Sequence, residues 1–133
     1  MRTIHAYSLA KDGDKHLAKH FRVREFACKD GSDTVFVAEL LPVVLEAIRG
    51  VVGKAVVLTS AYRTEAHNAA VGGEENSKHL YGMAADIYVK GITPAELAAV
   101  ARLIMPDWGG VGIYTKEGFV HIDVREERAD WSS

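Results

Sequence analysis

Apolar residues recur every three to four positions in two stretches of the chain, and this spacing predicts two amphipathic helices. The first covers about 37–49, where Phe36, Leu40, Val44 and Ile48 are four residues apart. Pro42 lies near its start, where a missing backbone donor does little harm, and Gly50 and Gly53 end it. The second follows Thr93-Pro-Ala-Glu96, a capping box with proline at the first helical position, and runs to about 104. A shorter helix over 65–71 follows the N-cap residue Thr64 and stops at Gly72-Gly73.

Short runs of apolar or alternating residues predict the strands. They cover 54–59, 84–89, 110–114 and 119–124, and the last two form a hairpin around 115–118. Residues 20–26 suggest a short strand or edge segment, the rest of 1–34 is polar and irregular, and 74–83 is a polar loop. Because these elements do not alternate as regular βαβ units, the sequence predicts an α+β fold. We expect a small, largely antiparallel sheet flanked by helices.

Length and composition narrow the class of protein. The 133 residues suit one domain over 1–133, with 1–20 as an N-terminal extension of that domain. A net charge of -2 without a basic run argues against partners such as nucleic acid or a membrane surface, and we expect a monomer. No apolar stretch approaches the roughly 18 residues of a membrane span. The single Cys28 excludes an internal disulfide, and its apolar neighbours predict a buried side chain.

Two of the predicted strands carry residues that bind metal ions. Alternation places Asp86 on one face of 84–89 and the apolar Ala85, Ile87 and Val89 on the other. In 119–124, His121 and Asp123 share one face, opposite the apolar Val120, Ile122 and Val124. If the two strands are neighbours, Asp86 and His121 come within ligand range, with His79 one turn before the first strand.

Two imidazoles and one carboxylate are a ligand set of catalytic zinc, which leaves the fourth position open to water. The same three residues accept other divalent ions, and a lone histidine is more often structural than a ligand. The remaining histidines, at 5, 16, 20 and 67, we expect to be solvated.

The same residues give the chain a resemblance to a known family. Ser77, His79, Gly82, Ala84 and Asp86 match the S-x-H-x-x-G-x-A-x-D motif of the zinc D-alanyl-D-alanine carboxypeptidases, cell-wall metallopeptidases that share a fold with the hedgehog signalling domain. Val120-His121-Ile-Asp123 is similar to their second zinc motif, and Ser60-Ala-Tyr62-Arg63 resembles their S-x-Y-R segment. The resemblance covers roughly residues 20–131. The segments 26–31 and 125–131 resemble a subgroup of the family that is frequent among phage endolysins. It implies one Zn²⁺ ion held by His79, Asp86 and His121.

The resemblance also suggests roles for residues around the metal. It implies that Arg63 holds the substrate or the developing oxyanion, with Ser77 and Tyr62 as further substrate-binding residues. Several members carry a general-base carboxylate three residues before the zinc histidine, where this chain has Gly118. Asp123 or Glu117 is then the expected general base. Asp123 is the better placed of the two, and its alternative role is to orient a ligand or Arg63.

The implied function is hydrolysis of peptidoglycan stem peptides by a zinc peptidase of the carboxypeptidase or endopeptidase type. A non-catalytic, zinc-stabilised binding module is the alternative, since hedgehog domains keep the zinc site as binding modules. The N-terminus lacks the apolar core of a signal peptide, so we expect synthesis in the cytoplasm. Such a protein acts on the cell wall if it is released, as phage endolysins are, or otherwise in the cytoplasm.

Overall fold

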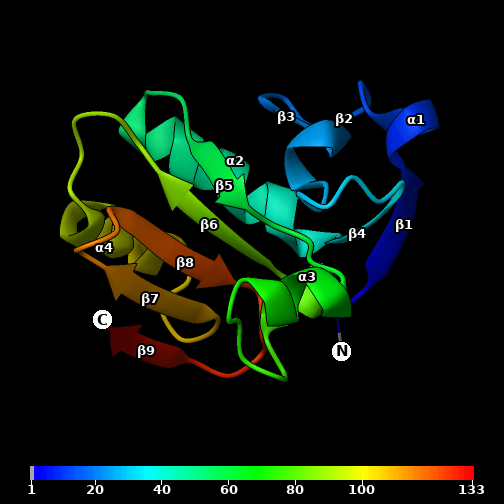
Figure 1. Cartoon of the computed structure of the whole chain (residues 1–133). Helices are drawn as coiled ribbons and strands as arrows, with labels where there is room; N and C mark the ends of the chain where they lie inside the picture. Colours follow the sequence, from blue (N-terminus) through cyan, green and yellow to red (C-terminus); the bar gives the residue numbers. More distant parts are fainter. Residues whose placement is uncertain (1) are drawn as a thin grey trace.

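A five-stranded sheet forms the centre of the molecule (Figure 1). The computed structural model describes residues 2–133. The strand order is β5-β6-β8-β7-β9, and every pair is antiparallel except β7–β9, which is parallel. The strands are β5 (Val57–Ser60), β6 (Ala84–Tyr88), β7 (Gly110–Tyr114), β8 (Phe119–Asp123) and β9 (Ala129–Ser132). The α+β fold and the largely antiparallel sheet predicted from the sequence are confirmed.

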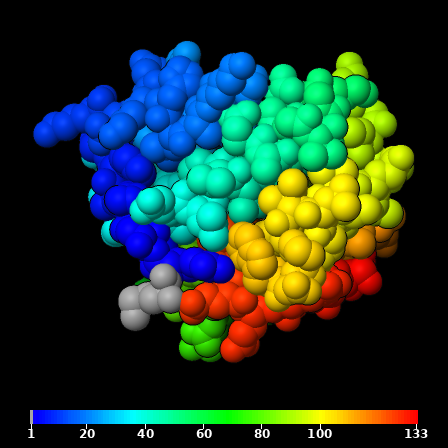
Figure 2. Space-filling model, turned by 180° about the vertical axis from the view of Figure 1, so that it is seen from behind, coloured from blue at the N-terminus to red at the C-terminus, as the bar shows by residue number. Residues whose placement is uncertain are grey.

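Two helices cover one face of this sheet. They are α2 (Leu40–Val52) and α4 (Pro94–Ile104), and they lie side by side in Figure 2. Both helices bury an apolar stripe against the apolar face of the sheet. On the helices the stripe includes Leu41, Leu45, Ile48 and Leu97, and on the sheet Ala85, Ile87, Val120 and Ile122. The predicted capping box is present, since Thr93 Oγ1 accepts from Glu96 N and the Glu96 carboxylate accepts from Thr93 N. The polar face of the sheet therefore lies on the side away from these helices.

The N-terminal third has more structure than the sequence predicted. β1 (Ile4–Ser8) pairs with β4 (Thr34–Ala38), and β2 (His16–Ala18) pairs with β3 (Phe21–Arg22). Two short helices, α1 (Leu9–Asp12) and the 3₁₀ helix η1 (Val23–Phe26), complete it. The expectation of an irregular segment was therefore wrong. The two small sheets are anchored because Val35 and Val37 of β4, together with Phe21, Val23 and Phe26, enter the main core.

The start of the first long helix was also predicted wrongly. Residues 36–38 belong to β4, and α2 begins only at Leu40. Val35 and Val37 are buried whereas Phe36 is exposed, which is the two-residue alternation of a strand. Phe36 happens to lie four residues before Leu40, so it mimicked a helical position.

Cys28 and strand β9 complete the comparison with the sequence predictions. Cys28 is buried and forms no disulfide, as expected. Strand β9 was not predicted, because the alternation of its four residues Ala129–Ser132 is too short to identify. Within residues 2–133 we find no helix with the length and hydropathy that crossing a membrane requires.

Two small helices approach the polar face of the sheet. They are α3 (Glu65–Ala70), capped by Thr64, and the 3₁₀ helix η2 (Lys78–Tyr81), which falls within the loop predicted at 74–83. In Figure 1, α3 lies in front of the sheet, below β5 and β6. They position the loop that borders the site described next.

Candidate metal centre

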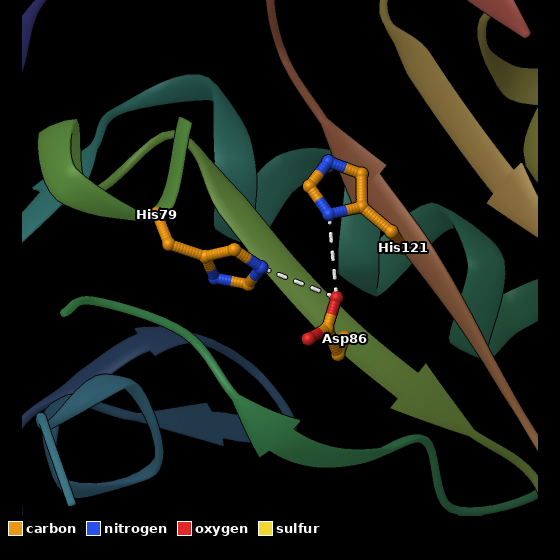
Figure 3. A group of neighbouring side chains, drawn as sticks. All are labelled: His79, Asp86 and His121. Carbon is orange, nitrogen blue, oxygen red and sulfur yellow. Dashed lines mark hydrogen bonds and ion pairs between the residues drawn. The ribbon is translucent and has the colours of Figure 1, made fainter. Parts of the chain in front are cut away.

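His79, Asp86 and His121 converge on the polar face of the sheet (Figure 3). Asp86 on β6 and His121 on β8 are directly opposite one another in the antiparallel register. His79 reaches the same point from η2. One ligand atom from each residue lies within 4.8 Å of the others, and all three side chains are buried. The neighbouring-strand arrangement predicted from the alternation of polar and apolar residues is thus the one observed.

Gly82 connects η2 to β6 and sets the spacing between His79 and Asp86. Its φ of 70° is in the left-handed region, which glycine adopts without strain. A Cβ on this residue would lie 2.2 Å from the carbonyl oxygen of Phe36, so the backbone of β4 leaves no room for a side chain. Upstream, Ser77 Oγ accepts a hydrogen bond from His79 N and caps η2.

The tautomer of His79 follows from its hydrogen bond to the backbone. The ring Nδ1 is 2.6 Å from the carbonyl oxygen of Ala61, which can only accept, so Nδ1 carries the proton. The other nitrogen, Nε2, lies 3.2 Å from Asp86 Oδ1. In the neutral ring, Nε2 therefore presents its lone pair to the point where the three residues meet.

His121 is oriented in the opposite sense by Asp123. Its Nε2 donates to Asp123 Oδ2 over 2.8 Å, and its Nδ1 lies 3.3 Å from Asp86 Oδ1. Two imidazole nitrogens and one carboxylate oxygen thus face a common point. Burial alone would raise the pKa of Asp86, but hydrogen bonds with His121 and His79 hold it well below its usual range. An ionised carboxylate with two oriented imidazoles fits zinc with an open fourth position.

Asp123 is fully buried beside His121 and has its oxygens occupied by protein donors. Besides His121, it accepts from the backbone N–H groups of Gly110 and Arg125 and, bidentately, from Arg125 Nε and Nη2 at 2.8 and 2.7 Å. These hydrogen bonds from Arg125 and His121 outweigh burial and keep the pKa of Asp123 low. This placement favours the orienting role over the general-base role. Carboxylate partners of this kind fix the ring and tautomer of metal-binding histidines.

Arg63 orients the carboxylate of Asp86. Its Nη2 donates to Asp86 Oδ2 over 3.3 Å, which leaves Oδ1 to face the histidines. Nε donates to Ser60 Oγ and Nη1 to Asn68 Oδ1, so the guanidinium is held from three sides. The Arg63 side chain is 14% exposed and still borders the open space in front of the metal ligands.

A cavity of about 730 Å³ opens in front of the three ligands. This volume is in the range of small-molecule and peptide sites. It is lined by residues of the segment 71–78 other than Glu75 and by three aromatic side chains, Tyr114, Phe119 and Trp131. Of the residues predicted to bind substrate, Arg63 and Ser77 line it. Tyr62 does not, because its ring packs edge-on against Phe36, and Glu117 lies exposed in the β7–β8 turn outside the cavity.

The sequence reasoning gave no site role to several lining residues, among them Glu74, Lys78, Arg125 and Trp131. Trp131 reaches the cavity from β9, where its ring centroid is 5.0 Å from that of His121 and its Nε1 donates to the Tyr114 hydroxyl. A signal was present in Gly110-Val-Gly112. A Cβ at Gly110 would lie 2.3 Å from Asp123 Oδ2, and one at Gly112 would lie 2.4 Å from Trp131 Nε1. Alternate glycines in a strand indicate such close approach.

A family model described as Peptidase M15 matches residues 19–123, well over half of the chain. No curated protein matches the chain significantly. The matched region contains all three residues of the metal centre together with Arg63 and Asp123.

Proposed function

Because the chain belongs to the peptidase M15 family, the zinc D-Ala-D-Ala carboxypeptidases, we propose that it hydrolyses amide bonds in peptidoglycan stem peptides with one zinc ion. One observation carries the proposal. His79 Nε2, Asp86 Oδ1 and His121 Nδ1 face one point at the floor of a cavity, while Ala61 and Asp123 hold the remaining ring nitrogens.

His79, Asp86 and His121 would hold the zinc. A zinc ion bound there supplies a Lewis acid that polarises a carbonyl group and lowers the pKa of water from about 15.7 toward about 7. Other residues of the chain orient the ligands of this ion. Asp123 keeps the His121 ring oriented, and Arg63 keeps the second oxygen of Asp86 engaged. The Arg63 guanidinium also borders the cavity, where it is placed to stabilise negative charge on the substrate.

A carboxylate must accept the proton of the attacking water. Glu74 is the candidate, because it lines the cavity in front of the ligands, and its negative charge acts on Arg125 of the same cavity. Asp123 has its oxygens occupied by protein donors, and Glu117 lies outside the cavity. We therefore assign to Glu74 the general-base role that was expected from the sequence for Asp123 or Glu117.

The substrate class follows from the family and the shape of the site. An open cavity lined by both polar and aromatic side chains accepts a peptide. The resemblance of the motifs to those of the cell-wall enzymes favours peptidoglycan as the source of that peptide. The protein then acts on the wall after release from the cytoplasm, as phage endolysins do.

The test is digestion of purified peptidoglycan with and without a chelator, followed by mass analysis of the fragments. We expect new amino and carboxyl ends that disappear with chelator and return with added zinc. His79→Ala should lose both zinc and hydrolysis, whereas His5→Ala, a change on the exposed strand β1, should keep both. If the protein binds one equivalent of zinc and cleaves nothing, the peptidase is refuted in favour of a zinc-stabilised binding module.

A further inference from the structure

Lys78 and Arg125 lie between two cavities. Both residues line the metal cavity, and both also line a second cavity of about 480 Å³. The second cavity is bordered further by Arg2, Ile4, Tyr81, Met83, Glu126 and Glu127. A peptide that extends from the metal centre into the second cavity must therefore pass these two cationic side chains.

Lys78 differs from the other cations of the metal cavity in having no anionic partner. Arg63 pairs with Asp86 at 3.3 Å and Arg125 with Asp123 at 2.7 Å. Among residues 2–133 no carboxylate lies within ion-pair distance of Lys78 Nζ, whose recorded contact is the Tyr81 ring at 6.0 Å. Among the described residues, Lys78 is therefore the cation at the junction that has no ion-pair partner.

Arg125 supplies fixed hydrogen-bond donors beside this charge. Its Nε and Nη2 are bound to the carboxylate of Asp123, and its guanidinium carbon lies 5.3 Å from the centre of the Trp131 ring. These contacts hold the plane of the guanidinium. The third nitrogen, Nη1, has no hydrogen-bond acceptor among the described residues, so its two N–H groups remain for a ligand.

The acidic residues nearby act on Arg125. Hydrogen bonding to Asp123 raises the pKa of Arg125 above its usual value, and the negative charges of Glu74 and Glu127 add to this effect. The charge of Arg125 is thus balanced by its surroundings, and this residue offers a ligand fixed N–H donors. Lys78 offers a ligand net positive charge. An anion with two acceptor oxygens matches this pair.

Resting on the proposed function, we propose that Lys78 and Nη1 of Arg125 bind a carboxylate of the peptide substrate at the junction of the two cavities. The substrate is then an acidic stem peptide. The carboxylate comes either from the C-terminus of the peptide or from a free carboxylate within it, such as that of an isopeptide-linked D-glutamate.

The experiment compares three synthetic stem pentapeptides on the zinc-loaded protein. One is the parent peptide, one has a C-terminal carboxamide, and one has D-isoglutamine in place of D-glutamate. kcat/KM is measured for the wild type, Lys78→Gln and Lys78→Arg. The matched control is Lys90→Gln, which removes the same charge from an exposed position outside both cavities. Zinc stoichiometry is measured for every variant, because Lys78 adjoins His79.

We expect the wild type to prefer the parent peptide over one of the two amides by about tenfold, as one charge-assisted contact would give. The amide that loses activity identifies the source of the carboxylate. Lys78→Gln should abolish the preference, Lys78→Arg should restore most of it, and Lys90→Gln should retain it. Equal rates on all three peptides, or a preference that survives in Lys78→Gln with zinc bound, overturns the subsite.

Failure of the proposed function gives a different result. If the wild type cleaves none of the peptides, their dissociation constants are measured by calorimetry on the same zinc-loaded protein. A tenfold preference for the carboxylate that disappears in Lys78→Gln then supports the subsite without catalysis. Equal affinities overturn it independently.

Discussion

Replacing Asp123 by asparagine tests whether this residue orients His121 or acts as a general base. The substitution keeps the shape of the side chain but puts an NH₂ group where Oδ2 accepts from His121 Nε2 and Arg125 Nη2. Each lost hydrogen bond to a charged group is worth about 1.5 to 3 kcal/mol. Breaking a buried ion pair by removing one partner costs about 3 to 5 kcal/mol. The lower end of the ion-pair range, about 3 kcal/mol, applies here, because the Arg125 side chain is 28% exposed and water can reach it.

We therefore expect Asp123→Asn to lower the free energy of unfolding by about 3 kcal/mol, which corresponds to a fall in Tm of about 12 °C for a chain of this size. Zinc affinity should fall about 10- to 100-fold, as it does when a partner of a metal-binding histidine is lost. The measurements are urea denaturation of the metal-free protein and competitive zinc titration. Asp130→Asn is the control, because Asp130 also pairs with arginines but its side chain is 50% exposed, so its loss should cost at most about 1 kcal/mol.

Two outcomes separate the alternatives. If Asp123→Asn keeps its stability within about 1 kcal/mol of the wild type and binds zinc normally, the argument from burial and hydrogen bonding is refuted. If such a variant also loses hydrolysis, Asp123 acts as the general base after all.

The remaining predictions concern three other positions. Glu74→Gln should lower kcat by about 10²- to 10⁴-fold with zinc content unchanged, whereas Glu75→Gln, outside the cavity, should not; equal kcat values for both would remove Glu74 from the mechanism. Gly82→Ala should cost more stability than Gly53→Ala in thermal melts, because both have positive φ but only Gly82 has a backbone atom within 4 Å of the new Cβ; equal costs would contradict the steric argument. Hydrogen bonds from Ser32 and Thr64 hold the pKa of Asp30 below its unfolded value of about 3.9, so their contribution to stability is present above that pH and is lost as the pH falls further. Asp30→Asn should therefore flatten the acid limb of the curve of stability against pH between about 4 and 2, and an unchanged limb would exclude this role.

The residues of the candidate metal centre could be predicted from the sequence because alternation in a strand fixes which side chains share a face. Asp86 and His121 each stand on a strand whose other face is apolar, and burying those apolar faces on the same helices brings the polar faces together. The pattern also placed Asp123 beside His121, but it did not show which of the two proposed roles Asp123 has or that Arg63 contacts Asp86. The contact of Arg63 with Asp86 and the burial of Asp123 depend on how loops approach the sheet, which no local periodicity encodes.

The errors in the N-terminal third have a related cause. Residues 4–38 form two small two-stranded sheets from strands of two to five residues, so the periodic signal in each strand is weak. Their stability comes from a few side chains, among them Phe21 and Phe26, that enter a core made by distant residues. Trp131 was missed for the same reason, since four residues of edge strand contain too little pattern to identify.

The position of β8 has a consequence for the order in which the protein can form during synthesis. β8 lies between β6 and β7, although it follows both in the chain. β5 and β6 can pair as soon as residue 88 has left the ribosome, but one edge of β6 then stays open until residues 119–123 arrive. An open strand edge is a template for pairing with other chains. The β7–β8 hairpin, which is local in sequence, both closes that edge and brings His121 to Asp86. The same pairing event in the nascent chain thus covers the open edge of β6 and completes the candidate metal centre.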